Sequence, residues 1–325
     1  MENIQNMSSI ILKNISKKYD KTEFIKNFTL NIDSEKITVL LGPTGCGKST
    51  ILKIIAGLIE PDSGEIYMDN VRINSFTPAQ RGIGMIFQQN TLFPHMKVKN
   101  NIEFGLIAQK WKKDRIEERI GYLSELLSIQ NILERYPSEL SGGEQQKVAI
   151  ARALAPMPKV LLLDEPLSSL DARIKMEILD DLKMLQKSLK LTYVYVTHDH
   201  EEAFMIGDNI VIMENGTKMQ EGDPESIYNA PANGFVAWFV GYNKINIKGN
   251  EIYVKPEQII LEDGEYEAVL DSVFVGKANW RLILNYNGQK IAVVTDADTG
   301  KKFSDKTSKS IKFKINNYLS YKKIY

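Results

Sequence analysis

A glycine-rich segment near the N-terminal end has the residue types needed to hold phosphate groups. It reads Gly42-Pro43-Thr44-Gly45-Cys46-Gly47-Lys48-Ser49-Thr50, and it lies between the apolar run 37–41 and a helical pattern over 48–58. The glycines permit a tight turn whose N–H groups point at phosphate oxygens, and the helix adds its positive N-terminal end. The spacing is that of a phosphate-binding loop, in which Lys48 neutralises the β- and γ-phosphates and Ser49 offers its hydroxyl to Mg²⁺. We expect Thr50 to reach the α-phosphate.

Two adjacent carboxylates supply acidic groups of the kind that phosphoryl transfer uses. Asp164 and Glu165 follow the apolar run 160–163, which has the length of a buried strand. Acids at a strand end are often only a solvated terminus, but beside a phosphate-binding loop they gain a chemical role. Phosphoryl transfer depends on positioning and charge neutralisation more than on covalent chemistry. We therefore expect Asp164 to hold Mg²⁺ and Glu165 to polarise the attacking water.

A second segment could bind an anion at the start of a helix. Leu140-Ser141-Gly142-Gly143-Glu144 leads into a helical pattern over 143–154. A serine followed by glycine amides combines an N-cap with the positive end of the helix dipole. The alternative is an ordinary Ser/Gly N-cap that binds no ligand.

The single cysteine, Cys46, lies inside the phosphate-binding loop. A helix start beside a lysine should favour its thiolate. We expect a bulky thiol reagent to block nucleotide binding, and bound nucleotide to protect the thiol. One cysteine allows no intrachain disulfide, which fits a reducing cytoplasm.

The elements that must position these residues alternate between strands and helices. Strand-like runs cover 10–15, 24–32, 37–41, 83–87, 160–163 and 192–196, and helical spacing covers 48–58, 112–128, 143–154 and 172–189. This alternation predicts a largely parallel, three-layer α/β core. A charged helical block between Gln88 and Leu140 interrupts it and indicates an inserted helical subdomain.

The sequence changes character after about Gly241. The segments 245–254, 266–275, 281–286 and 290–294 are short and rich in Val, Ile and Tyr, and Asn287-Gly288 is a hairpin turn signal. We expect a small β-barrel-like domain there, which divides the chain into residues 1–241 and 242–325. A length of 325 residues also favours two domains.

The overall composition argues against several classes of protein. Lys+Arg and Asp+Glu both total 41, and the resulting net charge of zero gives no sign of a nucleic-acid partner. No run approaches the roughly 20 apolar residues that a membrane helix needs, and the N-terminal residues show no secretory signal. A role at a membrane would therefore require attachment to another protein.

Four motifs, in this order, resemble those of the ATP-binding cassette (ABC) transporter family. They are GPTGCGKST at 42–50, LSGGEQQ at 140–146, LLLDEP at 161–166 and THD at 197–199. The resemblance covers about residues 10–241 and implies a P-loop ABC ATPase core with ATP and Mg²⁺ as ligands. It places the helical subdomain at about 89–157. The LSGGE sequence argues against a P-loop kinase or a switch GTPase.

The resemblance implies a homodimer with shared sites. Ser141, Gly142, Gly143 and Glu144 would meet the γ-phosphate held by a second copy, so that two ATP molecules close a head-to-tail pair. Glu144 is a departure, since other members often have Gln at this position.

Four further residues gain roles from the resemblance. These are Gln88 as the sensor of Mg²⁺ and the lytic water, His198 as the γ-phosphate contact, Asp171 in the loop 168–171 that joins the two sites, and Tyr19 as the ring that stacks on adenine. Gln89 is the neighbouring alternative to Gln88, and a lone Tyr is more often a packing residue. A metal site at His198 and His200 is disfavoured, because clustered Cys or carboxylate ligands are missing from this stretch.

Two further stretches resemble the import class of the family. The segment 91–96 resembles the one that abuts the coupling helix of a membrane subunit, and its Leu, Phe and Met are expected to be exposed together. Residues 235–241 and 254–257 resemble the join into a TOBE/MOP-like regulatory domain. This implies a peripheral protein at the cytoplasmic face of the membrane, with two permease subunits and, indirectly, an extracytoplasmic solute-binding protein.

The expected solute is an oxyanion such as molybdate or tungstate, because residues 239–245 most resemble importers of those ions. Importers of sugar, polyamine, sulfate or ferric iron are the alternatives. A soluble ABC ATPase acting on DNA or ribosomes is the alternative of another class. Such proteins usually carry coiled-coil insertions or two cassettes, and neither pattern is found in this sequence. An exporter would not need the β tail.

Overall fold

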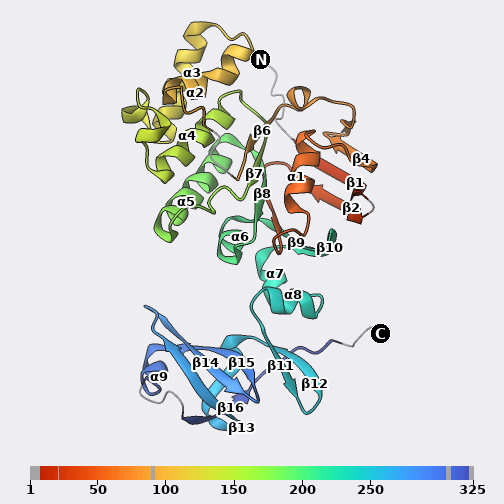
Figure 1. Ribbon diagram of the computed structural model, residues 1–325, viewed down its shortest axis with the longest axis vertical. Coiled ribbons are helices and arrows are strands. Elements are labelled where there is room, and N and C mark those ends of the chain that lie inside the picture. The colour runs from red at the N-terminus through yellow and green to blue at the C-terminus, as the bar shows by residue number, and fades with distance from the viewer. Residues whose placement is uncertain (1–7, 21, 89–91, 305–308, 322–325) are drawn as a thin grey trace. The chain divides into compact units, whose positions relative to one another are not determined.

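The computed structural model describes residues 8–20, 22–88, 92–304 and 309–321 (Figure 1). The chain forms two compact units, residues 1–224 and 225–325. A functional boundary near Gly241 remains a prediction. Among the described residues, no helix combines the length and apolar character required to cross a bilayer.

A six-stranded sheet forms the centre of the first unit. Its strands, in spatial order, are β10 (Thr217–Gly222), β9 (Asn209–Glu214), β3 (Ile37–Leu41), β8 (Thr192–Thr197), β7 (Val160–Asp164) and β6 (Ile83–Ile86). All neighbours are parallel except β10, which pairs antiparallel with β9. Every residue of β3, β7 and β8 is buried, as expected for strands covered on both faces. The predicted parallel α/β core is confirmed.

A second sheet in this unit is antiparallel, with the order β2-β1-β4-β5. Its strands are β1 (Ile10–Tyr19), β2 (Thr22–Ile32), β4 (Ser63–Met68) and β5 (Val71–Arg72). Helix α1 (Lys48–Ala56) supplies buried apolar residues, such as Ile51 and Ile55, to a core that also contains residues of both sheets. The helix that follows the phosphate-binding loop is therefore fixed on more than one side.

The remaining helices of the first unit include the block expected to form a subdomain. Helices α2 (Val98–Ala108), α3 (Lys113–Leu126) and α4 (Gly142–Leu154) gather together, followed by α5 (Ala172–Leu189) and α6 (His200–Ile206) (Figure 1). Short 3₁₀ helices lie at η1 (Pro78–Arg81), η2 (Gln130–Ile132) and η3 (Pro137–Glu139). The bounds 89–157 remain a prediction, and residues 89–91 lie outside the described part of the chain.

The second unit is built around a curled antiparallel sheet of order β15-β14-β13-β16. Its elements are α7 (Pro224–Asn229), α8 (Gly234–Phe239), β11 (Asn243–Ile247), β12 (Asn250–Val254), η4 (Pro256–Gln258), β13 (Ile259–Phe274), β14 (Asn279–Tyr286), β15 (Gln289–Asp296), α9 (Ala297–Lys301) and β16 (Ser310–Ile315). The predicted hairpin at Asn287-Gly288 is confirmed, with φ values of 51° and 80°.

The β-rich segment 245–254 contains parts of two strands, and the turn between them was not predicted. Lys248 and Gly249 adopt φ values of 51° and 85°, so the chain reverses and β11 pairs with β12 in a two-stranded hairpin. A Lys-Gly pair is a weaker turn signal than Asn-Gly, because lysine has no short polar side chain to support the left-handed conformation.

Two side-chain carboxamides join this hairpin to the curled sheet. Asn243 donates from Nδ2 to the carbonyl of Ala292 and accepts from the N–H of Ala292, both at 2.7 Å. Gln289 makes the same reciprocal pair with the backbone of Asn246, at 2.7 and 3.2 Å. Each carboxamide thus substitutes for a missing strand neighbour. Asn243 is buried, so water cannot readily replace it.

We expect Asn243→Leu to destabilise the second unit by about 1–3 kcal/mol, because it leaves both polar backbone groups of Ala292 without partners in a buried place. Gln289→Leu removes the same kind of pair at a more exposed position and should cost less. Urea unfolding with amide hydrogen exchange at β11 and β15 would measure both variants. Equal losses would contradict the role assigned to burial.

Candidate functional site

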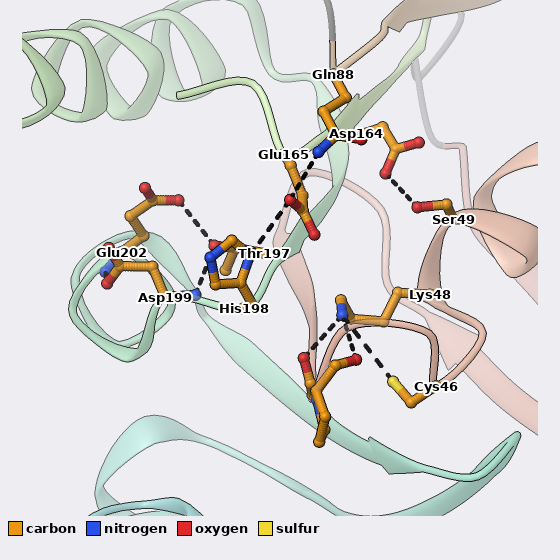
Figure 2. Close-up of polar contacts among 12 residues, drawn as sticks. Cys46, Lys48, Ser49, Gln88, Asp164, Glu165, Thr197, His198, Asp199 and Glu202 are labelled. Carbon is orange, nitrogen blue, oxygen red and sulfur yellow. Dashed lines mark hydrogen bonds and ion pairs between the residues drawn. The ribbon is translucent and has the colours of Figure 1, made fainter. Parts of the chain in front are cut away.

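The candidate site lies where four parallel strands end side by side. Strands β3, β8, β7 and β6 are neighbours in the sheet, so their carboxyl ends form one edge. The residues that follow these strands are the phosphate-binding loop, His198, the pair Asp164–Glu165, and Gln88. Figure 2 shows most of these side chains around one space. Ligands of open α/β sheets bind outside this edge.

The phosphate-binding loop needs glycine for two separate reasons. Gly45 and Gly47 adopt φ values of 82° and 107°, which L side chains rarely take. At Gly42, an added Cβ would lie 2.4 Å from the carbonyl oxygen of Met213. Thr44 and Gly45 are exposed at the tip, and Pro43 and Thr50 are half-buried. The tip of the loop at Thr44 and Gly45 is therefore open to solvent.

Lys48 is folded back into this loop. Its ammonium donates to the carbonyl oxygens of Gly42 at 2.7 Å and Pro43 at 2.9 Å, and the residue is 4% exposed. The positive charge is therefore held under the turn before a phosphate arrives. Preorganised charge of this kind requires little rearrangement to neutralise an anion.

Ser49 and Asp164 form the pair expected to face Mg²⁺. The hydroxyl of Ser49 donates to Asp164 Oδ1 at 2.7 Å (Figure 2). Burial raises the pKa of Asp164, and the Ser49 hydrogen bond and the Lys53 charge offset this in part. A hydroxyl and a carboxylate are hard oxygen ligands that suit Mg²⁺, which usually takes only one or two carboxylates beside phosphate oxygens. The residues present therefore fit this ion.

The side chain of Glu165, which follows β7, contacts residues that follow the neighbouring strands β6 and β8. Gln88 Nε2 donates to Glu165 Oε2 at 3.1 Å, and His198 Nδ1 lies 3.2 Å from the same oxygen. Glu165 itself has a φ of 45°, and its N–H donates to the carbonyl of Val196 at 2.9 Å. A left-handed glutamate is strained, and such strain clusters at functional sites. The structure thus brings together the three residues predicted to be catalytic. Gln89, the alternative to Gln88, lies outside the described residues.

Ser141 begins α4 with a reciprocal capping box. Its hydroxyl accepts from the N–H of Glu144 at 3.3 Å, and Glu144 Oε2 accepts from the Ser141 N–H and hydroxyl, both at 2.8 Å. These hydrogen bonds, led by that from the Ser141 N–H, lower the pKa of Glu144. The glutamate in place of glutamine therefore completes the cap of this helix.

Gly142 and Gly143 allow other residues to pack closely against this helix start. A Cβ at Gly142 would lie 3.0 Å from Leu170 Cδ2, and one at Gly143 would lie 2.9 Å from Ile174 Cγ2. Asp171 caps α5 by accepting from the N–H groups of Arg173 and Ile174, both at 3.1 Å. The start of α4 and the loop 168–171 are thus in contact within one chain.

Tyr19 lies at the end of β1 and is partly exposed. Its ring meets that of Phe24 edge to face, with centroids 5.5 Å apart. Phe24 Cε1 is also 3.7 Å from the place where a Cβ of Gly47 would stand. One aromatic contact therefore connects Tyr19 with the phosphate-binding loop. Stacking on adenine remains a prediction.

Sequence reasoning missed a buried arginine that supports α1. Arg81 NH1 donates to the carbonyls of Ile54 and Ile55 at 2.8 and 2.7 Å, which are carbonyls at the C-terminal end of α1. A cation there is favourable for the helix dipole and fixes the far end of the phosphate-binding helix. The pattern around Arg81 carried no signal, because its partners lie 26 and 27 residues away.

The thiolate expected at Cys46 is contradicted by its surroundings. Cys46 is 6% exposed and belongs to the main hydrophobic core. Burial raises the pKa of the thiol, and the nearby charge of Lys48 lowers it by less. The loop glycines turn the side chain inward, which residue spacing alone did not reveal.

The segment 92–96 is less exposed than expected. Leu92 is buried and Phe93 half-buried, while Thr91 lies outside the described residues. The Phe93 ring packs 4.7 Å from that of Phe104, and Asn101 Nδ2 holds the segment by donating to the Phe93, Met96 and Lys97 carbonyls. The exposed apolar surface here instead comes from Phe104 and Ile107 on α2.

Comparison with known proteins identifies a family model and relatives by sequence. The model described as ABC transporter matches residues 25–168. The maltose/maltodextrin import ATP-binding protein MalK of Photorhabdus laumondii is 45% identical over 240 residues, covering 74% of this chain and 65% of that protein. This chain thus spans just under two thirds of that relative's length. The Fe(3+) ions import ATP-binding protein FbpC of Fusobacterium nucleatum is 38% identical, covering 89% and 86%. The spermidine/putrescine import ATP-binding protein PotA of Haemophilus influenzae is 43% identical, covering 82% and 71%.

Two solved structures are similar to the chain. The cbiO1 protein of Clostridium perfringens, part of the ABC transporter complex cbiONQ, has a TM-score of 0.64 at 31% identity, covering 68% of this chain and 90% of that one. The ATP-binding cassette MJ0796, in a dimeric post-hydrolysis state with ADP and Pi, has a TM-score of 0.60 at 33% identity, covering 66% and 98%.

We expect Cys46 to react slowly with a thiol reagent such as dithionitrobenzoate in the native chain, at least roughly tenfold more slowly than in the unfolded chain. Because its pKa is raised, the native rate should climb with pH to a midpoint above the value of about 8.5 of a free cysteine. Cys46 is the only cysteine, so the released thiolate reports it alone. Rapid reaction at neutral pH would show that the thiol is accessible and ionised.

Proposed function

The chain belongs to the ATP-binding import proteins of the ABC transporter family, a family of ATPases, and we propose that it is the ATP-hydrolysing subunit of an importer. The observation that carries this proposal is the meeting of Lys48, the Ser49–Asp164 pair and Glu165 at one sheet edge. Phosphoryl transfer needs groups that neutralise charge, ligands for the metal ion and a carboxylate that orients the attacking water.

Different residues of the site would bind the phosphates and the metal ion. Lys48 and the loop N–H groups would bind the β- and γ-phosphates, while Ser49 and Asp164 would hold Mg²⁺ with Gln88. When bound, Mg²⁺ neutralises charge that develops between these phosphates. Helix α1 is packed in the core and held at its far end by Arg81, so binding at the loop would orient the γ-phosphate toward Glu165.

Glu165 would orient the attacking water. Gln88 and His198 both face its Oε2, so Oε1 is the oxygen that can accept a hydrogen bond from the water. His198 would stabilise charge on the γ-phosphate. A carboxylate held on one oxygen keeps the other in a fixed place, which lowers the entropic cost of reaction.

A complete site would need a second copy of the chain. The capped start of α4, with Ser141 and Gly142 exposed, is an anion-binding helix end that the phosphate-binding loop of the same chain does not require. We propose a head-to-tail homodimer in which this end meets the γ-phosphate of the partner copy. The dimeric post-hydrolysis state of MJ0796 supports such pairing.

The relatives favour a sugar, polyamine or ferric iron as the solute. The names of the relatives refer to maltose and maltodextrin, Fe(3+) ions, and spermidine and putrescine. Molybdate and tungstate, which the stretch 239–245 had suggested, find no support among them. We therefore propose an importer of one of these other solutes. We further propose that residues 242–325 form a TOBE/MOP-like domain that regulates the importer.

Permease subunits would attach the protein to the cytoplasmic face of a membrane. Phe104 and Ile107 lie three residues apart on α2, so they share one face of the helix, and both are exposed. The ring of Phe93 packs against that of Phe104. We propose this apolar face as the permease docking surface.

Two inactive variants should restore each other's activity when mixed. Glu165→Gln should abolish hydrolysis by losing the carboxylate for water, and Ser141→Arg should abolish it by blocking the shared phosphate contact. In mixed dimers, both defects fall on one site and the other site is intact. We expect up to roughly a quarter of wild-type ATPase activity in an equal mixture, since half of the dimers would be mixed and half of their sites intact.

Each variant alone, at the same total concentration, is the control. Circular dichroism would verify folding, since Ser141→Arg also removes an N-cap worth about 1 kcal/mol. A mixture as inactive as its components, although exchange into mixed dimers is demonstrated by two affinity tags, would contradict the shared site.

The importer role predicts stable association with a membrane permease. A tagged chain expressed with its neighbouring reading frames should co-purify in detergent with a multi-span protein, and Ile107→Glu should weaken this at least about tenfold through loss of apolar contact and burial of a charge. Tyr122→Glu, at an exposed apolar residue on α3 of the same unit, is the matched control. Recovery with ribosomes or DNA instead would favour the soluble alternative.

A further inference from the structure

One threonine hydroxyl holds the chain on both sides of His198. Thr197, the last residue of β8, donates from Oγ1 to Glu202 Oε2 at 2.9 Å and accepts from the N–H of Asp199 at 2.9 Å (Figure 2). Thr197 and Asp199 are the two neighbours of His198 in the sequence. These hydrogen bonds therefore restrict the backbone that carries the imidazole.

Glu202 supports this arrangement from inside the protein. It is 4% exposed, and its Oε2 also accepts from the hydroxyl of Tyr195 at 2.9 Å. Its Oε1 lies 3.1 Å from the ammonium of Lys175. A buried carboxylate is stable only with such hydrogen bonds and an opposite charge, so removal of one partner weakens the whole cluster.

Lys175 brings a second element to the cluster. Its ammonium also lies 3.4 Å from Asp199 Oδ2, and its backbone N–H donates to the carbonyl of Asp171 at 2.9 Å. Asp171 is both the N-cap of α5 and the last residue of the loop 168–171. Lys175 thus connects this loop directly to Asp199, which follows His198, and to Glu202, which in turn holds Thr197.

Side-chain packing leaves a gap beside these contacts. A cavity of about 230 Å³ lies between α5 and α6, and it is lined by Leu170, Ala172, Lys175, Met176, Leu179, Asp199, Glu201 and Glu202. Close packing normally fixes the distance between neighbouring helices. Beside this cavity, Lys175 joins α5 to α6 by charged hydrogen bonds to Asp199 and Glu202, and Lys183 adds a further link by donating to the carbonyl of Met205 at 2.8 Å.

We propose that Glu202 and Lys175 are positioning residues that couple the loop 168–171 to His198 of the same copy. The proposal rests on the proposed function, in which this loop meets the second copy and His198 faces the γ-phosphate. A partner that shifts the loop would move the start of α5 and Lys175 with it. Asp199 and Glu202 would move with Lys175, and His198 would move with Asp199. The two sites of a dimer would therefore hydrolyse ATP cooperatively.

Lys175→Met should lower kcat at least about tenfold while the Kd for ATP stays within about twofold, because no residue that touches nucleotide has changed. The Hill coefficient for ATP should fall from a value above 1 in the wild type toward 1. Lys175→Arg keeps the charge and should restore most of both quantities. Lys175→Met combined with Glu202→Gln should be no worse than the poorer single variant, since both interrupt one connection.

Lys147→Met is the matched control. It removes the ion pair between Lys147 and Asp181, at 2.9 Å, which joins α4 to the same helix α5. The lysine side chains are similarly exposed, at 27% for Lys147 and 22% for Lys175. Lys147→Met should therefore cost comparable stability and leave the Hill coefficient unchanged.

A second measurement does not depend on ATP hydrolysis. The chain has three histidines, so ¹³C-labelled imidazole resonances of the full-length protein can be assigned by single substitutions. Lys175→Met should shift the resonance of His198 and leave that of His95 unchanged, whereas Lys147→Met should shift neither. An unmoved His198 resonance, or a Hill coefficient equal to that of the wild type, would overturn the proposal. A wild-type protein without ATPase activity would overturn the proposed function, and the resonances would still decide whether Lys175 positions His198.

Discussion

The backbone of Glu165 is the constraint on which the rest of the site depends. Its left-handed conformation costs about 1–2 kcal/mol for a residue with a Cβ. The N–H of Glu165 nevertheless remains bonded to the carbonyl of Val196 on the neighbouring strand, so the sheet itself holds the strained turn. The carboxylate is thereby kept over the sheet edge, where Gln88 and His198 reach it from the strands on either side.

Those parts of the site that are contiguous in sequence could be predicted, and those made by distant packing could not. The phosphate-binding loop and the Asp164–Glu165 pair are recognisable because their chemistry requires certain residues at fixed spacing. The parallel core followed from alternating strands and helices. The environment of Cys46 was misjudged because its burial comes from residues of other strands. Glu202 and Lys175 carried no signal, since 27 residues separate them. The β11–β12 hairpin was missed because Lys-Gly is a weak turn signal.

Gly142 and Gly143, in the LSGGEQQ motif, would meet two requirements at once. In the proposed dimer, the exposed Gly142 would let the amides at the start of α4 approach the phosphate of the partner copy. The lack of a Cβ also lets Leu170 and Ile174 pack closely against the helix start. A substitution there would therefore disturb the contact with the loop 168–171 together with the proposed phosphate contact. Ser141 likewise has two roles, since it is exposed at the helix start and also caps α4 through Glu144.

The inward-facing thiol of Cys46 also has a practical side. A chain whose only native cysteine lies in the core should behave as a cysteine-free background toward bulky reagents, if Cys46 reacts as slowly as expected above. A new cysteine on an outer face of either unit would be the one rapidly labelled position. Fluorophores or spin labels could therefore be attached one at a time, with the phosphate-binding loop left in its natural sequence.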